Sequence, residues 1–394
     1  MLAIRVKQVF DGRKVVAGAG VVFVDDGRIV GVESTTADIP RGCRVLDRPT
    51  ATVLPGLVDA HVHLLADSGP GALDRLADYS DDDCDRVIEQ TLRVTLSSGV
   101  TTVRDLGDRN YAVLEWRTQH AGAVAPTIVA SGPPITTPRG HCANMGGEAA
   151  GPVALRAAVR ERAARGADLI KIMASGGAMT AGTSMTHAQH SVQDLAVVVA
   201  EAHDAGLTVT AHAHPLAAIR DAITAGVDGI EHCTFMTPAG MDFAPDVIAM
   251  LAERQIAVCP TLGSAPGATK MPPQLLEIVR LSGLTPERRY QKIVAMSEAG
   301  VRLVSGTDGG INPGKPHGML AQALAQLVLG GMTPADALAS ATSVAAEVCG
   351  LGHRKGSVQP GHDADLLVID GDPLTDIATL TRVDTVILNG QPIS

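Results

Sequence analysis

One unit recurs along the middle of this 394-residue chain and limits the folds open to it. In each copy an Ala-rich segment typical of a helix ends near a glycine, and a short β-branched run follows. The copies are LSSGVTTVRDLG, AARGADLIKIMASGG, HDAGLTVTAHAHP, ITAGVDGIEHCT, AERQIAVCPT and SEAGVRLVSGTDGG, with GLVDAHVHL as the first strand and APTIVASGPP as one more. Strands that alternate with helices pair in parallel, so these eight strands predict an α/β fold, a (β/α)8 TIM-like barrel.

The two ends of the chain have a different sequence pattern. Residues 1–50 alternate apolar and polar side chains, with Asp25-Asp26-Gly27 as a hairpin signal. The stretches DADLLVID and RVDTVILNG return to that pattern near the other end. Since a barrel needs only ~250 residues, the remainder suffices for a second unit. We therefore expect a small β-sandwich domain built from residues 1–55 plus 355–394, and a barrel over residues 56–354.

Composition excludes several classes of protein. Aromatic residues make up only 2% of the chain, so Ala, Val, Leu and Ile must fill the core, as is usual for helices packed on parallel strands. A net charge of -10 without a basic stripe argues against a nucleic-acid partner, and no apolar run is long enough to predict a membrane span. The six cysteines are scattered without a CxxC pair, and the first residues lack the apolar core of a signal peptide, which favours the cytoplasm. The oligomeric state stays open, a homo-oligomer included.

Polar side chains recur where the predicted strands end. His61 and His63 close the first strand, and because side chains two residues apart share a face, both rings can point toward one place. The other strand-end residues of this kind are Lys171, His212, His214, His232 and Asp308. Any one of them has a structural explanation, such as a hydrogen-bonded core histidine or a helix cap. Together, at the end of a barrel that carries the chemistry, they predict a functional site.

The residue types favour a pair of divalent metal ions. Imidazole and carboxylate groups suit Zn²⁺ or a similar ion, and the absence of nearby cysteines argues against a closed structural site. Lys171 cannot bind a cation as an ammonium. A buried lysine loses its proton readily, however, and a carbamate formed from CO2 would be an anionic ligand able to bridge two metals. The alternative for Lys171 is a salt bridge to Glu231 or Asp168.

The motifs HVH, IKIMASGG, TAHAH, GIEHCTF and SGTDGG occur in this order, and GSVQPGHDADLLVID follows them. In this the chain resembles the amidohydrolase superfamily, and more narrowly its imidazolonepropionase-related branch, which includes binuclear Xaa-Pro dipeptidases, metal-dependent carboxypeptidases and some hydrolases of carbamates or ureas. The resemblance implies that His61, His63 and Asp308 hold one metal. It implies a carboxylated Lys171 that bridges to a second metal, held by His212 and His232. His214 falls outside that pattern.

The resemblance also directs attention to two loops. His141, in TPRGHCANMGG, matches a loop histidine that the branch uses near the substrate, although Arg139 stands where a small residue is usual. His190, in MTHAQHSVQDL, stands where peptidase relatives carry an aromatic residue, typically Tyr, that helps to hold the substrate. His187 and His190 either face the substrate together or are solvated loop histidines.

These features predict a metal-dependent amidohydrolase that cleaves an amide-type C–N bond in an N-acyl amino acid, a dipeptide or a carbamate-like small molecule. A hydroxide that bridges two metals would attack the carbonyl, and Asp308 would carry the proton to the leaving amine. Three alternatives stay open. A mononuclear cyclic-amide or imidazolone hydrolase, or a deaminase, would use His61, His63, His212 and Asp308, but such relatives generally lack the bridging lysine. The second alternative is a metal-binding barrel without turnover. The third is lyase or isomerase chemistry at the same site.

Overall fold

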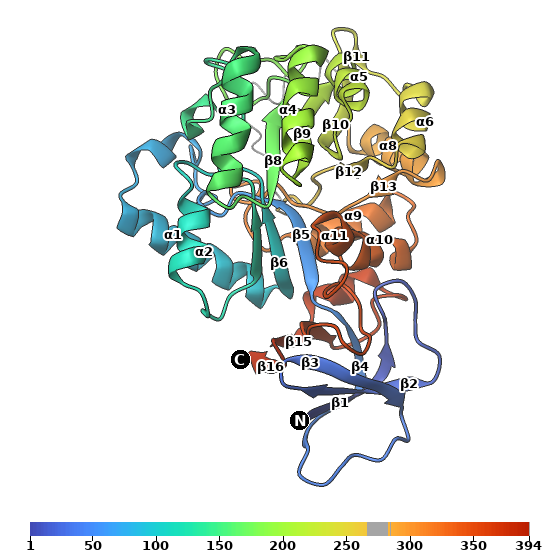
Figure 1. Ribbon diagram of the computed structural model, residues 1–394. Helices are drawn as coiled ribbons and strands as arrows, with labels where there is room; N and C mark the ends of the chain where they lie inside the picture. Colours follow the sequence, from blue (N-terminus) through green and yellow to red (C-terminus); the bar gives the residue numbers. More distant parts are fainter. Residues whose placement is uncertain (266–282, 284, 394) are drawn as a thin grey trace.

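The computed structural model describes residues 1–265, 283 and 285–393, and Figure 1 gives its labels. Its central feature is a ring of parallel strands. These are β5 (Leu57–Val62), β6 (Val100–Asp105), β7 (Thr127–Ala130), β8 (Leu169–Met173), β9 (Thr208–Pro215), β10 (Gly229–Thr237), β12 (Ala257–Cys259) and β13 (Arg302–Leu303). They pair in the order β5-β6-β7 and β8-β9-β10-β12-β13, while the short β11 (Gly240–Met241) pairs with β10.

Backbone hydrogen bonds close the two arcs into a barrel. Between β7 and β8, the Ile135 N–H donates to the Lys171 carbonyl at 2.8 Å. Between β13 and β5, the Ala60 N–H donates to Ser305 at 3.0 Å and the Asp308 N–H donates to His61 at 2.8 Å. The predicted TIM-like barrel is therefore confirmed, and the carboxyl ends of its strands share one rim.

Helices cover the outside of the barrel (Figure 1). They are α1 (Asp81–Ser97), α2 (Ala112–Gln119), α3 (Gly151–Ala164), α4 (Val192–Asp204), α5 (Leu216–Ala225), α6 (Pro245–Glu253), α8 (Pro286–Glu298), α9 (Leu320–Leu329), α10 (Pro334–Ser340) and α11 (Ser343–Val348). Short 3₁₀ turns are η1 (Asp74–Asp78), η2 (Ala143–Met145) and η3 (Ile377–Thr381). A capping box begins α4, because the Ser191 side chain accepts from the Asp194 N–H and Asp194 accepts from the Ser191 N–H. Within the described residues, no helix has the length and apolar character needed to cross a membrane.

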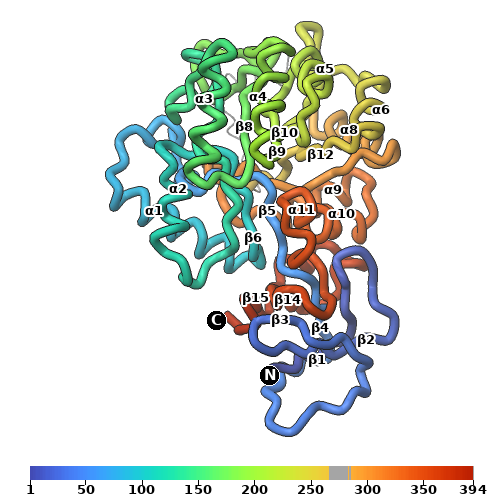
Figure 2. Tube along the Cα trace, in the orientation of Figure 1, coloured from blue at the N-terminus to red at the C-terminus, as the bar shows by residue number. Residues whose placement is uncertain are grey.

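Strands from both chain ends form a second sheet. They are β1 (Leu2–Val9), β2 (Ala19–Asp25), β3 (Arg28–Ser34), β4 (Arg44–Pro55), β14 (Leu366–Ile369), β15 (Val383–Leu388) and β16 (Gln391–Ile393), in the order β16-β15-β14-β4-β1-β2-β3. Asp26 and Gly27 turn β2 into β3 with φ of 45° and 72°, as the hairpin signal predicted. Figure 2 traces both termini into this unit. This is the predicted β-sandwich domain, while its boundaries at residues 55 and 355 stay a prediction.

Candidate metal centre

Three predicted ligands converge where β13 and β5 end. Asp308 follows β13, and its backbone N–H bonds to the carbonyl of His61 in β5, which brings its side chain beside the first strand. Oδ1 of Asp308 lies 3.4 Å from Nε2 of His61 and 3.3 Å from Nε2 of His63. All three side chains are almost entirely buried. One carboxylate and two imidazoles therefore face a common point.

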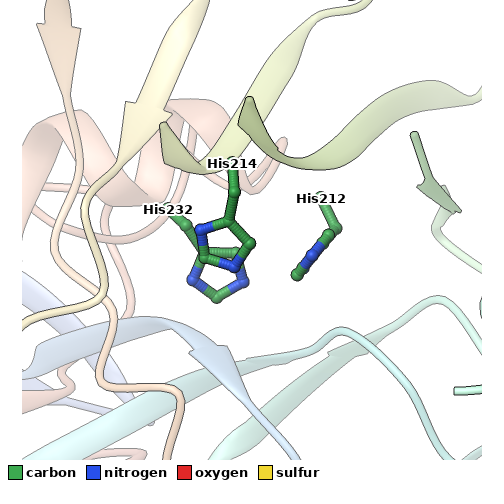
Figure 3. Close-up of side chains that lie close together, drawn as sticks. All are labelled: His212, His214 and His232. Carbon is green, nitrogen blue, oxygen red and sulfur yellow. The ribbon is translucent and has the colours of Figure 1, made fainter. Parts of the chain in front are cut away.

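A second group comes from the next part of the rim. His212 and His214 of β9 and His232 of β10 place their ring nitrogens within 4.8 Å of one another (Figure 3). The rings of His214 and His232 stack with centroids 4.7 Å apart, and the ring of His212 meets that of His232 edge-on at 4.6 Å. The centroids of His232 and His61 are 5.3 Å apart, which joins this group to the first. The family pattern does not include His214 among the metal ligands. In the structure it nevertheless lies with His212 and His232, which that pattern includes.

Hydrogen bonds to one ring nitrogen leave the other free for a ligand. In four of these histidines Nδ1 lies at hydrogen-bond distance from a protein oxygen, the arrangement that commonly orients metal-binding imidazoles. The pairs are His61 with Glu231 Oε2 at 2.7 Å, His63 with the Gly107 carbonyl at 2.9 Å, His214 with Thr234 Oγ1 at 3.0 Å, and His232 with Thr261 Oγ1 at 2.9 Å. His212 differs, since its Nε2 lies 3.2 Å from the Gly176 carbonyl. Nδ1 is therefore the nitrogen that His212 has free.

Lys171 is enclosed in β8 with only 1% of its surface exposed. The salt bridge expected as its alternative is not found within the described residues. Glu231 is instead held by other side chains, and Asp168 pairs with Arg117. Burial lowers the pKa of Lys171, although the carboxylates of Glu231 and Asp308 oppose this effect. A buried amine with a lowered pKa is the form of lysine that can react with CO2.

The protonation states of the donor groups fit bound divalent cations. Burial lowers the pKa of His61 to about 4 and the pKa values of His212 and His232 well below their ordinary range. For Asp308 burial acts in the opposite direction, but the hydrogen bond from His63 brings its pKa down to about 2. At neutral pH His61, His212 and His232 are therefore neutral imidazoles and Asp308 is an ionised carboxylate, the states that a metal requires. His63 differs, because burial lowers its pKa but the hydrogen bond to Asp308 and the charge of that carboxylate outweigh burial and raise it. Nitrogen and oxygen donors in this mixture suit zinc and similar ions.

The structure places His141 beside the second histidine group. Its ring centroid lies 4.7 Å from that of His212, and its Nδ1 lies 3.0 Å from Thr180 Oγ1. The loop is held by the His141 N–H, which donates to Gln189 Oε1 at 2.7 Å. Arg139, two residues earlier, is exposed. Of these two predicted substrate contacts, His141 therefore packs against a metal-ligand candidate, whereas the side chain of Arg139 faces solvent.

His187 and His190 have different surroundings. His187 is exposed, and its Nδ1 lies 3.2 Å from Thr186 Oγ1. His190, directly before the cap of α4, is 4% exposed, and its Nε2 has no hydrogen-bond partner within the described residues. Burial lowers the pKa of His190, with Asp194 opposing. The two histidines therefore do not act as an equivalent pair, and His190 is the one with an unused buried nitrogen.

Sequence reasoning missed the charged network below the ligands. Glu231 accepts hydrogen bonds from Arg104 Nη2 at 2.9 Å and from Thr210 Oγ1 at 2.6 Å, in addition to its contact with His61. Arg104 also donates from Nε to the Ala60 carbonyl at 2.7 Å. The guanidinium of Arg104, a residue far from Glu231 in the sequence, balances the charge of this buried carboxylate. The one available signal was a glutamate directly before His232 in an otherwise apolar strand.

Two further residues missed by the sequence reasoning hold the loop after β13. Asp59 accepts from the Thr307 N–H at 3.0 Å and from Thr307 Oγ1 at 2.7 Å, which fixes the residue before Asp308. Lys315 Nζ donates to the carbonyls of Thr261 at 2.7 Å and Thr307 at 3.0 Å. Thr261 is also the partner of His232, so these contacts tie both groups of ligand candidates to one loop framework.

Known proteins resemble this chain over most of its length. A model of the Amidohydrolase family matches residues 52–393. Ochratoxinase of Aspergillus niger is 28% identical over 391 residues, covering 90% of this chain and 78% of the relative. An uncharacterised protein of Mycobacterium bovis is 30% identical over 381 residues, covering 94% of this chain and 91% of the relative. A solved Xaa-Pro dipeptidase, with methionine bound in its active site, has a TM-score of 0.86 at 28% identity and covers 100% of this chain and 99% of its own.

Proposed function

Because the chain belongs to the amidohydrolase family, as its motifs predicted, we propose that it hydrolyses an amide-type C–N bond in a small molecule at a binuclear metal centre. The substrate classes are N-acyl amino acids, dipeptides and carbamate-like compounds. The likeness to a solved Xaa-Pro dipeptidase supports the peptide class. The observation that carries the proposal is the pair of ligand groups at one barrel rim, joined by the neighbouring rings of His61 and His232.

In this proposal His61, His63 and Asp308 would hold one ion, and His212 and His232 would hold the other. A carbamate on Lys171 would supply a further anionic ligand to the centre. Two zinc ions bound by these residues would supply an activated water and a Lewis acid for the scissile carbonyl. His214 lies close enough to His212 and His232 to be a further donor to the second group.

Asp308 is the residue to which we assign the proton transfer. Its low pKa, about 2, leaves it ionised at neutral pH and able to accept a proton from the attacking water. The side chain is 13% exposed, more than the 1% of His61, so a reacting group can reach it. An amine leaves poorly as an anion, and Asp308 would return the proton to its nitrogen.

His141 and His190 are the proposed substrate contacts, with His187 and Arg139 at the outer end of the same loops. Burial lowers the pKa of His141 to about 4, so it is neutral at pH 7 and can donate or accept a hydrogen bond. His190 is also buried with a lowered pKa, which favours a hydrogen bond to the substrate over an ion pair. Both contacts would suit a carbonyl or amide group of the substrate.

The cellular setting follows from the same proposal. All six cysteines are free thiols, and burial raises the pKa values of Cys142 and Cys233 to about 12. Such thiols stay protonated at neutral pH and act neither as metal ligands nor as nucleophiles. We infer a cytoplasmic enzyme of small molecules that acts without a nucleic-acid or membrane partner. Whether it forms a homo-oligomer is a matter for measurement in solution.

The test is a hydrolysis screen of zinc-loaded protein against N-acyl amino acids, dipeptides and aryl carbamates, with release of the amine as the readout. The proposal expects turnover of at least one class. Asp308→Asn should reduce that turnover, whereas Asp204→Asn, at an exposed position at the end of α4, should not. No turnover of any class by fully loaded protein would contradict the proposal.

A further inference from the structure

A cavity of about 300 Å³ lies at the end of the barrel opposite the metal centre. The first residues of four neighbouring strands line it, namely Thr208, Gly229, Ala257 and Arg302. In a parallel barrel the first residues of the strands form one rim and the last residues form the other. His212 and His232 lie toward the rim formed by the last residues, whereas the cavity lies at the opposite rim. Glu347 of α11 forms another side of the cavity. The cavity is therefore separate from the candidate active site.

A buried guanidinium lines this cavity. Arg104 is 3% exposed, and its side chain crosses the barrel interior from β6 to reach Ala60 in β5 and Glu231 in β10. Nε and Nη2 make those two hydrogen bonds. Nη1 makes none within the residues that the structure describes, so this nitrogen keeps its donors for a ligand in the cavity. A buried donor on a permanently charged group is a strong recognition element for an oxyanion.

The charged groups around the cavity leave it positive. Arg254 and Arg302 line the wall, and neither has a carboxylate partner in the described part of the chain. Of the two acidic residues of the wall, Glu347 forms an ion pair with Arg13. Asp228 lies 2.9 Å from His203 Nε2 and also accepts from a backbone N–H, so Arg254 and Arg302 together outweigh its single charge.

We propose that this cavity binds a small metabolite that carries a carboxylate or phosphate group, held by Arg104, Arg254 and Arg302. Its volume, at the small end of the range for ligand pockets, suits a compact molecule. Arg104 is also the partner of Glu231, which holds His61, so a ligand on Arg104 is two contacts from the metal centre. Binding does not depend on the proposed function, whereas an effect on turnover rests on it.

Binding is measured by calorimetry on full-length, zinc-loaded protein with inorganic phosphate, succinate and the uncharged analogue succinamide. We expect phosphate, succinate or both to bind and succinamide not to bind. Since each charge-assisted hydrogen bond contributes about 1.5–3 kcal/mol, Arg302→Glu should weaken that binding about tenfold or more. The matched control is Arg93→Glu on α1, whose side chain is 75% exposed and lies outside the cavity wall.

An oxyanion can also bind to metal ions, so its location must be determined. Crystals of the zinc-loaded protein soaked in the tighter-binding probe should show it between Arg104, Arg254 and Arg302. Density at the metal centre alone, or an affinity that Arg302→Glu leaves unchanged, would overturn the proposed site. Binding of neither anion would overturn it as well.

The coupling to the metal centre has its own readout. The rate at which a chelator removes zinc should change when the cavity is occupied, and Arg302→Glu should abolish this response, whereas Arg93→Glu should keep it. This measurement needs no substrate, so it remains informative if the proposed hydrolysis fails. An unchanged rate at saturating anion would contradict the coupling through Arg104 and Glu231.

Discussion

Replacing Glu231 with glutamine should weaken both the fold and the metal centre. Glu231 is 1% exposed, and its carboxylate contacts both His61 Nδ1, at 2.7 Å, and Arg104 Nη2, at 2.9 Å. An amide presents one oxygen and one NH2 group, so one of these two donors would face another donor. The buried charge of Arg104 would also lose its counterion.

The magnitude follows from these contacts. Removal of one partner from a buried ion pair costs about 3–5 kcal/mol, because the other charge stays buried. Loss of the group that orients a ligating histidine typically weakens metal affinity about 10- to 100-fold. Thr210→Val is the matched control, since it removes a single neutral donor to the same carboxylate and leaves the ion pair with Arg104 in place, and it should cost less, about 1.5–3 kcal/mol.

The assay combines urea unfolding of each variant with zinc competition against a chelator. We expect Glu231→Gln to lose stability by about the amount above and to bind zinc more weakly, while Thr210→Val changes zinc affinity little. If Glu231→Gln kept the stability and zinc affinity of the wild type, the role of Glu231 as the link between Arg104 and His61 would be refuted.

Four further predictions concern the site itself. Asp308→Asn should keep most of the bound metal and lose about 10²- to 10⁴-fold in kcat, and turnover equal to that of Asp204→Asn would refute its role in proton transfer. Lys171→Ala should lose at least the second ion by elemental analysis, and unchanged metal content would exclude a bridging carbamate. His190→Ala should lower kcat/KM more than kcat, and the exposed His187→Ala should change neither as much; equal effects would contradict their different burial. Burial lowers the pKa of His190 below its ordinary value of 6.5. The stability that depends on its neutral ring is therefore complete above pH 6.5 and is lost as the pH falls through the lowered pKa. His190→Gln should accordingly flatten the fall in melting temperature on the acid side of pH 6.5.

The sequence predicted those parts of the molecule that local patterns determine. Alternating helix and strand signals gave the barrel, and Asp26-Gly27 gave the turn between β2 and β3. Strand ends were sufficient to select His61 and Asp308, because every parallel strand delivers its last residues to the same rim. These predictions needed only short windows of sequence and one rule of topology.

The supporting contacts could not be predicted in that way. Glu231 is 170 residues from His61 and 127 from Arg104 in the chain, and no local pattern indicates that the three side chains meet. The different burial of His187 and His190 depends on where α4 begins, since Ser191 caps that helix and His190 precedes it directly. Such features depend on how distant strands and helix ends pack together.

The central claim is a centre for two metal ions, and metal content per chain tests it most directly. The protein should be purified, stripped with a chelator, reloaded with zinc and bicarbonate, and measured by elemental mass spectrometry while zinc is titrated. The geometry of the two ligand groups predicts a plateau near two ions per chain, with amide hydrolysis restored along with the metal. A plateau at one ion per chain, with full activity, would contradict the binuclear account and favour the mononuclear alternative.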